Sequence, residues 1–298
     1  LITIAACQGD NVQVLDHENA EQLFARKDYV SANHLYAASE LMEILNKEPE
    51  TIIFEVSKAE VYDNGHIPGA YQIWRPDFAT KNNHAVSGMR ATKAELSELL
   101  SHFGVKPETK ILIYDNRANV EALRFLWLLK MYGHQHLMII NGSKKAWIDA
   151  GFPLETKRNT PGLRTDYQFL NKTDSSLLAA YSDVLQVISD TNTILVDTRE
   201  PYEYDGKPFI KDGQVNKFKP GAFSAGRISN ARHLNWSSTV DLSGDHRFKS
   251  LRDLEYDIKK VGLNKDKQII VYCHSGTRSA HTAYVLKEIL GFPNVRNY

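Results

Sequence analysis

The stretch Gln268-Ile269-Ile270-Val271-Tyr272-Cys273 decides the fold, because the chain contains a second version of it. The counterpart in the first half is Lys110-Ile111-Leu112-Ile113-Tyr114-Asp115. Each is a short apolar run between polar residues, as expected for a strand buried on both faces of a parallel sheet. A helical pattern follows each one, over Glu121 to Met131 and over Ser279 to Ile289, and a glycine ends each pattern. The repeated strand and helix predict two similar α/β domains.

Other segments repeat in the same order. Thr51 to Val56 corresponds to Thr193 to Thr198, and Gly65 to Ala70 corresponds to Gly226 to Ala231. The second copy also contains an insertion from Glu200 to Ala225, which we expect to form surface loops near a site. Short strands alternating with amphipathic helices predict, for each copy, a mainly parallel sheet with helices on both faces.

The repeat also sets the expected domain boundaries. We place one domain at residues 19–154 and the other at 175–298, with a linker over 155–174 that is rich in charges, proline and glycine. Helical spacing resumes over residues 177–188. Because the segment from Asn141 to Gly151 has no counterpart at the end of the chain, we expect the second domain to be truncated there.

Composition excludes several classes of function. The 298 residues carry 36 basic and 36 acidic side chains without a basic tract, which argues against nucleic acid as a partner. With only two cysteines and no paired metal-ligand spacing, we expect neither a metal nor a cofactor. Small anions remain suitable ligands, because one site can be positive while the whole chain is neutral.

The other cysteine, Cys7, ends the run Ile4-Ala5-Ala6-Cys7. This run resembles the lipobox of bacterial lipoproteins, in which the cysteine becomes lipidated and tethers a soluble domain to a membrane. The resemblance makes residues 1–18 a signal remnant and tether, and predicts a location in the bacterial cell envelope. The alternative is an ordinary apolar amino terminus on a cytoplasmic protein.

Cys273 has the sequence surroundings of a reactive thiol. It follows a buried strand, where open α/β sheets bind ligands, and the next helix directs its amino-terminal dipole towards it. Gly276 lets the loop turn tightly and Arg278 adds a positive charge, so residues 273–278 can cradle a thiolate with backbone N–H groups. The alternative is an inert, packed cysteine. In the first copy Asp115 occupies the cysteine position, so that cradle cannot accept sulfur.

These motifs together resemble those of the rhodanese superfamily, specifically its tandem-domain sulfurtransferases. The resemblance covers nearly everything after about residue 30, and it is carried by Gly65 to Ala70, Val196 to Glu200 with Tyr204 and Gly206, Cys273 to Arg278, and Asn141-Gly142 with Trp147. It implies two tandem rhodanese-like domains, an inactive first domain with aspartate in place of cysteine, and an active site between the domains.

The resemblance also implies a mechanism and roles. The thiolate of Cys273 would take sulfur from thiosulfate or 3-mercaptopyruvate, form a persulfide and pass the sulfur to a thiophilic acceptor such as cyanide or a thiol. The donor would be bound by the loop and by an arginine after the repeated glycine motif, that is by His274, Ser275, Gly276, Thr277, Arg278 and Arg232. Structural support would come from Asp197 and Arg199 as an ion pair, and from Ser279.

Two other functions compete with this hypothesis. Cysteine-dependent phosphatases and arsenate reductases of this fold need arginine six positions after the cysteine, where this chain has Ser279. A persulfide carrier or redox-sensing module would act only on a protein partner. The loop His274 to Arg278 matches neither the loop typical of tandem enzymes that prefer thiosulfate nor the loop typical of those that prefer 3-mercaptopyruvate. The sequence therefore leaves the choice between these two donors open. We expect thiosulfate, with His274 as a second cation, and a monomer.

Overall fold

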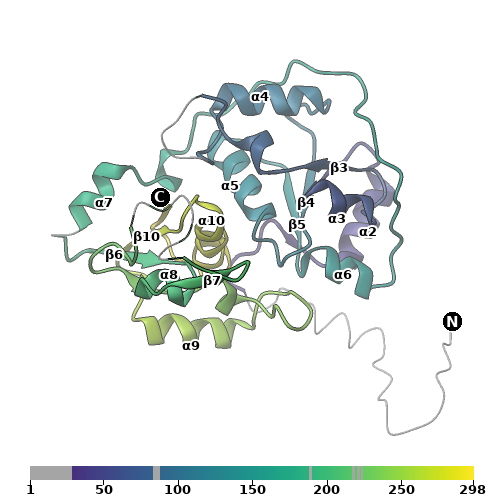
Figure 1. The fold of residues 1–298 in the computed structure, drawn as a ribbon. Coiled ribbons are helices and arrows are strands. Elements are labelled where there is room, and N and C mark those ends of the chain that lie inside the picture. Colours follow the sequence, from purple (N-terminus) through teal and green to yellow (C-terminus); the bar gives the residue numbers. More distant parts are fainter. Residues whose placement is uncertain (1–28, 83–87, 188–189, 217–218, 220–221, 223) are drawn as a thin grey trace, which may run out of the picture.

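The computed structural model describes residues 29–82, 88–187, 190–216, 219, 222 and 224–298. Cys7, the rest of residues 1–18 and the start of the predicted first domain lie outside the described residues. Figure 1 shows two α/β units side by side. None of the helices in the described part of the chain is long and apolar enough to cross a membrane.

The first sheet has five parallel strands in the order β1-β5-β4-β2-β3. The strands are β1 (Leu35–Tyr36), β2 (Ile52–Val56), β3 (Ala70–Ile73), β4 (Ile111–Tyr114) and β5 (Leu137–Ile140). The helices around them are α2 (Ala38–Lys47), α3 (Ala59–Asp63), the 3-10 turn η2 (Arg75–Phe78), α4 (Lys93–His102), α5 (Ala122–Tyr132) and α6 (Ser143–Asp149).

Alternation along β4 explains why helices cover both faces of this sheet. Ile111 and Ile113 pack on the side of α4 and α5, whereas Leu112 and Tyr114 pack on the side of α2, α3 and α6. Successive side chains of a strand point to opposite faces, so a wholly apolar strand needs a cover on each.

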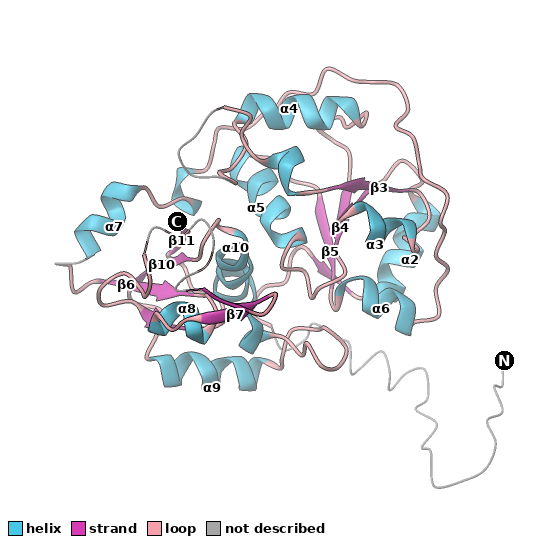
Figure 2. Cartoon of the chain, in the orientation of Figure 1, coloured by secondary structure: helices cyan, strands magenta, loops and turns pink. Residues whose placement is uncertain are grey.

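The second sheet has four parallel strands in the order β11-β10-β6-β9, and Figure 2 shows it beside the first. Its strands are β6 (Thr193–Asp197), β9 (Arg232–His233), β10 (Gln268–Tyr272) and β11 (Val295–Asn297), and an antiparallel hairpin of β7 (Phe209–Lys211) and β8 (Gln214–Asn216) lies in the predicted insertion. The helices are η3 (Ser175–Leu177), α7 (Tyr181–Val187), α8 (Pro201–Asp205), η4 (Trp236–Thr239), α9 (Leu251–Val261), α10 (Thr277–Tyr284) and the π-helical turn η5 (Val285–Ile289). The prediction of tandem, mainly parallel α/β domains is confirmed.

The helix predicted over residues 177–188 is wrong at its start. The backbone at Leu178 and Ala179 is extended and follows β11, because Leu178 bridges to Asn297 and the Ala179 N–H donates to the Asn297 carbonyl at 3.0 Å. The helix therefore begins only at Tyr181, and residue 188 lies outside the described residues. Strand pairing overrides local helical spacing here.

The predicted linker packs along the first domain and is not free. The Glu155 backbone bridges to His66, and the Thr165 N–H donates to the Ser101 carbonyl at 3.0 Å. Tyr167 and Phe169 are buried in the apolar core. This crossing segment therefore contributes to the fold and not only to its connectivity.

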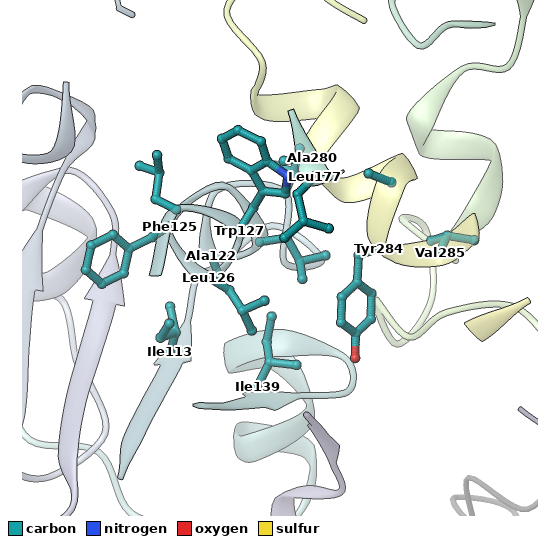
Figure 3. Packing of buried hydrophobic residues seen from close by; sticks show 14 of the residues in the cluster. Ile113, Ala122, Phe125, Leu126, Trp127, Ile139, Leu177, Ala280, Tyr284 and Val285 are labelled. Carbon is teal, nitrogen blue, oxygen red and sulfur yellow. The ribbon is translucent and has the colours of Figure 1, made fainter. Parts of the chain in front are cut away.

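One apolar core extends through both domains. It contains α5 from the first domain together with α9, α10 and η5 from the second. Figure 3 shows Trp127 of α5 close to Leu177 and Ala280, with Tyr284 and Val285 next to them. An ion pair between Lys130 and Glu288 joins the same helices. These contacts fix the position of the second domain against the first.

Candidate active site

An acid and a tyrosine brace the strand ends of both domains in the same way. In the first domain, the Tyr114 hydroxyl donates to Glu55 at 2.6 Å and accepts from the Ile67 N–H at 2.9 Å. In the second, the Tyr272 hydroxyl donates to Asp197 at 2.8 Å. It accepts from the Ile228 N–H at 3.1 Å. Each tyrosine thus ties the central strand to its neighbour and to the repeated glycine-motif loop.

The expected ion pair between Asp197 and Arg199 is present and buried. Arg199 Nη2 lies 2.6 Å from Asp197 Oδ2 and also donates to the Gly226 carbonyl at 2.8 Å. In the first domain, Lys144 of α6 takes this place, with Nζ 2.9 Å from Glu55 Oε1. Arg199 therefore anchors the glycine-motif loop at the edge of the site.

The first domain's cradle is filled by its own carboxylate. Asp115 is completely buried and accepts hydrogen bonds from the backbone N–H groups that follow it and from Ser143 Oγ. The N–H donors and their distances are Arg117 at 2.8 Å, Asn119 at 2.9 Å, Glu121 at 2.7 Å and Ala122 at 3.2 Å. A ring of inward N–H groups at a helix start is an anion site, and here the anion is a side chain.

In the second domain the same position holds the thiol of Cys273. The Cys273 side chain keeps part of its surface accessible to solvent, although protein atoms surround the sulfur on most sides. Burial raises the pKa of the thiol, but the charge of Arg278, the Ser279 hydroxyl, and the N–H groups of Ser279 and Ser275 outweigh it and hold the pKa below the ordinary value. The Ser279 Oγ lies 3.5 Å from the sulfur. The lowered pKa increases the share of the thiolate, which is the nucleophilic form of the side chain.

The loop turns as the sequence predicts. Gly276 has a φ of 80° and forms the N-cap of α10, and Thr277 begins the helix. The left-handed region suits glycine because other residues are strained there. Ser275 Oγ lies 3.4 Å from Thr277 Oγ1. The loop therefore turns back on the thiol, towards which the N–H groups of Ser275 and Ser279 are directed.

Arg278 reaches the site but is already engaged by a carboxylate. Its guanidinium forms a bidentate pair with Glu203 of α8, in which the Nη2–Oε1 distance is 3.1 Å. Both side chains are largely buried. Burial raises the pKa of Glu203, and Arg278 overrides this effect, so the pKa is lowered. The charge of Arg278 lowers the pKa of the thiol, while its Nη1 and Nη2 atoms each donate to Glu203.

Other cations surround the mouth of the site. Arg75, from the first domain, donates through Nε to Glu121 at 2.8 Å and interacts electrostatically with Cys273 and Arg278. Lys219, from the insertion, is 39% exposed and interacts with the same two residues. Neither was predicted, although the insertion was expected near the site. Arg75 follows the strand that begins at the end of the first glycine motif. Nothing in the local sequence indicates that it would lie near Cys273 of the other domain.

The surroundings of His274 and Arg232 differ from those expected from the sequence. Burial, followed by the charge of Lys219, lowers the pKa of His274, which disfavours the charged ring that was expected as a second cation. Arg232 is exposed, and its guanidinium donates to the carbonyls of Val261 and Gly262 at the end of α9. Arg232 pairs in register with Val196, whose side chain packs in the core on the α9 side of the sheet, so strand register places Arg232 on the face that α9 covers.

No group of three or more histidine, cysteine or acidic side chains in the described ranges is arranged to hold a metal ion.

Two α/β domains with a common core, a thiol in a six-residue cradle and a carboxylate in the matching cradle define a two-domain sulfurtransferase. The chain belongs to the rhodanese family, whose model, described as a Rhodanese-like domain, matches residues 37–150 and 181–298.

Curated relatives match along most of the chain. The sulfur carrier protein TtuD of Thermus thermophilus is 32% identical over 85% of this chain and 86% of its own length. The putative thiosulfate sulfurtransferase SseA of Mycobacterium tuberculosis is 34% identical over 80% of this chain and 76% of its own. The thiosulfate sulfurtransferase of Corynebacterium glutamicum is 29% identical over 92% and 88%.

A solved structure shows the same fold. The anaerobic ergothioneine biosynthesis enzyme of Chlorobium limicola, in complex with trimethyl histidine, superposes with a TM-score of 0.73 at 21% identity, over 89% of this chain and 66% of its own.

Proposed function

We propose that this protein transfers sulfane sulfur from thiosulfate, through a persulfide on Cys273, to a thiophilic acceptor. The thiolate attacks the outer sulfur of thiosulfate, the S–S bond breaks, and sulfite leaves with the bonding electron pair. The acceptor, cyanide or a thiolate, then attacks the outer sulfur of the persulfide, and the Cys273 thiolate is released. No outside oxidant or reductant enters the cycle.

The observation that carries this proposal is the environment of the thiol. The charge of Arg278, the Ser279 hydroxyl and the N–H groups of Ser279 and Ser275 lower its pKa, which increases the share of the attacking thiolate. The same groups would stabilise the anionic persulfide, as donors aimed at a developing charge do. Relatives named thiosulfate sulfurtransferase support the donor.

The donor's sulfonate would be held by Arg75 and Lys219. Both are partly exposed, and both interact electrostatically with Cys273. Arg278, proposed for this task from the sequence, already binds Glu203 through Nη1 and Nη2 and would instead act mainly by charge. The site would therefore bind thiosulfate between the two domains, with the outer sulfur towards the thiol.

The test is thiocyanate formation from thiosulfate and cyanide. Cys273→Ala should abolish it, and replacing thiosulfate with 3-mercaptopyruvate should lower kcat/KM. Lys219→Met should raise the KM for thiosulfate about fivefold, the equivalent of one charge-assisted contact of roughly 1 kcal/mol. Lys207→Met is the matched control, because Lys207 is exposed and pairs with Asp205. Full activity in Cys273→Ala would overturn the proposal.

A carrier role is the second candidate, favoured by an exposed apolar pair. Ile210 and Val215 face each other across the β7–β8 hairpin of the insertion and are 74% and 73% exposed. A protein acceptor could cover them, and one relative is named a sulfur carrier protein. This role predicts a stoichiometric burst of sulfite from thiosulfate with slow turnover on cyanide. Rapid turnover would argue against it.

We also propose that Cys7 carries a lipid that tethers the domains in a bacterial cell envelope, on the strength of the Ile4 to Cys7 motif alone. Expression of the full-length gene product with labelled palmitate should label the wild type and not Cys7→Ser. An unlabelled wild type would leave the alternative, a cytoplasmic protein.

A further inference from the structure

Arg124 is a buried cation in the domain that lacks the thiol. It lies in the first turn of α5 and is 7% exposed, among apolar neighbours on the same helix. Within the described ranges its guanidinium forms no ion pair with a carboxylate, and it lies over the Trp127 ring at 5.0 Å. A buried charge without a partner costs several kcal/mol, so such an arginine calls for an anion.

The guanidinium lies against the catalytic loop of the other domain. Arg124 Nη1 is 3.5 Å from the Gly276 carbonyl oxygen, which also accepts from Asn297 Nδ2 at 3.2 Å. A Cβ added to Gly276 would lie only 2.6 Å from Nη1. In a planar trans peptide the C=O and N–H point in opposite directions, so these two donors on the carbonyl orient the next N–H away from Arg124.

Of the four cations Arg278, Arg75, Lys219 and Arg124, only Arg124 lacks an ion pair with a carboxylate within the described ranges, and Arg90 lies near it as a like charge. The charge of Arg278 is matched by Glu203, and that of Arg75 by Glu121. Lys219 lies 4.0 Å from Glu203 as well. Burial lowers the pKa of Arg124 to about 10, and the interaction that opposes this most is with Cys273.

We propose that Arg124 is the counter-ion, supplied by the first domain, of the Cys273 thiolate and of the persulfide formed on it. Arg124 acts through charge and through the Gly276 peptide, and is therefore a positioning residue. The inference rests on the proposed sulfur transfer only in naming the persulfide. It assigns the domain without a thiol a direct part in making the thiol reactive.

The test is the pKa of Cys273, measured as the pH dependence of alkylation by iodoacetamide, which needs no sulfur donor. Arg124→Met should raise this pKa by about one unit, so that alkylation below it slows about tenfold. Arg124→Lys keeps the charge and should stay closer to the wild type than Arg124→Met. Should Arg124→Met fail to fold, Arg124→Gln gives the same expectation.

Arg117→Met is the matched control. Arg117 is also an arginine of the first domain that contacts the second, with its guanidinium 5.2 Å from the centre of the Trp236 ring, but it is exposed. It should leave the thiol pKa unchanged. A folded neutral variant of Arg124 with an unchanged thiol pKa, or a lysine variant as perturbed as methionine, would overturn the inference. If the wild type forms no thiocyanate although its alkylation shows the lowered thiol pKa, the proposed reaction is wrong, and the inference about Arg124 is still tested by the variants.

Discussion

Removing the carboxylate of Asp115 should convert the first domain's cradle into an empty anion site. In Asp115→Ala, four backbone N–H groups and the Ser143 hydroxyl lose their shared acceptor. Breaking a buried charged network by removing one partner costs about 3–5 kcal/mol, part of which a water can recover. We therefore expect the free energy of unfolding to fall by about 3 kcal/mol or more.

An added anion should then restore stability selectively. If sulfate enters the cradle with a Kd of about 10 mM, 100 mM sulfate stabilises the variant by about 1.4 kcal/mol. Urea unfolding with and without sulfate, at constant ionic strength, measures this. The wild type corrects for the general stabilising effect of sulfate, since its cradle is already filled.

Asp149→Ala is the matched control, because Asp149 is an exposed acid in a surface pair with Lys145. Its loss should change stability by less than about 0.5 kcal/mol. The reasoning is refuted if Asp115→Ala is no less stable than Asp149→Ala. A sulfate effect equal in the wild type and in Asp115→Ala would refute the anion-site interpretation alone.

Three further outcomes follow from charges and burial. Glu203→Gln should lower the pKa of Cys273 further, because Arg278 loses its compensating charge, and alkylation at pH 6 should accelerate; a slower rate would contradict this. In the wild type, the midpoint of the pH dependence of the alkylation rate should lie below 9.0, the ordinary thiol pKa. A midpoint at or above 9.0 would show that the site does not lower the pKa of the thiol. Burial lowers the pKa of His281 from 6.5 to about 3, so the stability of the neutral ring is complete above pH 6.5 and is lost as the pH falls towards 3. By pH 4.5 this loss amounts to roughly 3 kcal/mol, and His281→Leu should lose correspondingly less stability than the wild type between pH 7 and 4.5 in urea unfolding.

Features that depend on local pattern were predictable from the sequence. The paired strands ending at Asp115 and Cys273, and the tight turn at Gly276, follow from apolar runs, residue types and one glycine. The helix α5 ends at Gly133, whose φ of 100° is the left-handed conformation that glycine supplies at such an end. Each of these needs only neighbours in the chain.

Features that depend on packing between distant segments were not predictable. The pairing of Arg278 with Glu203 joins the catalytic loop to α8, and strand register alone directs Arg232 towards α9. Arg124 gave one usable sign, a charge inside the otherwise apolar pattern of α5, but its neighbour Gly276 lies in the other domain. Sequence spacing indicates which face a residue occupies, not what covers that face.

The apolar core that α5 shares with α10 has a practical consequence for dissecting the protein. Either domain expressed alone would expose an apolar surface, which includes Trp127 in the first domain and Tyr284 in the second. A protease cut at an exposed position of the crossing segment, such as Leu163, would break the chain but leave the shared core and the packing of Tyr167 and Phe169 in place, so the two fragments should hold together. The molecule is thus organised as a heterodimer encoded in a single chain, and co-expressed halves should reassemble into an active pair.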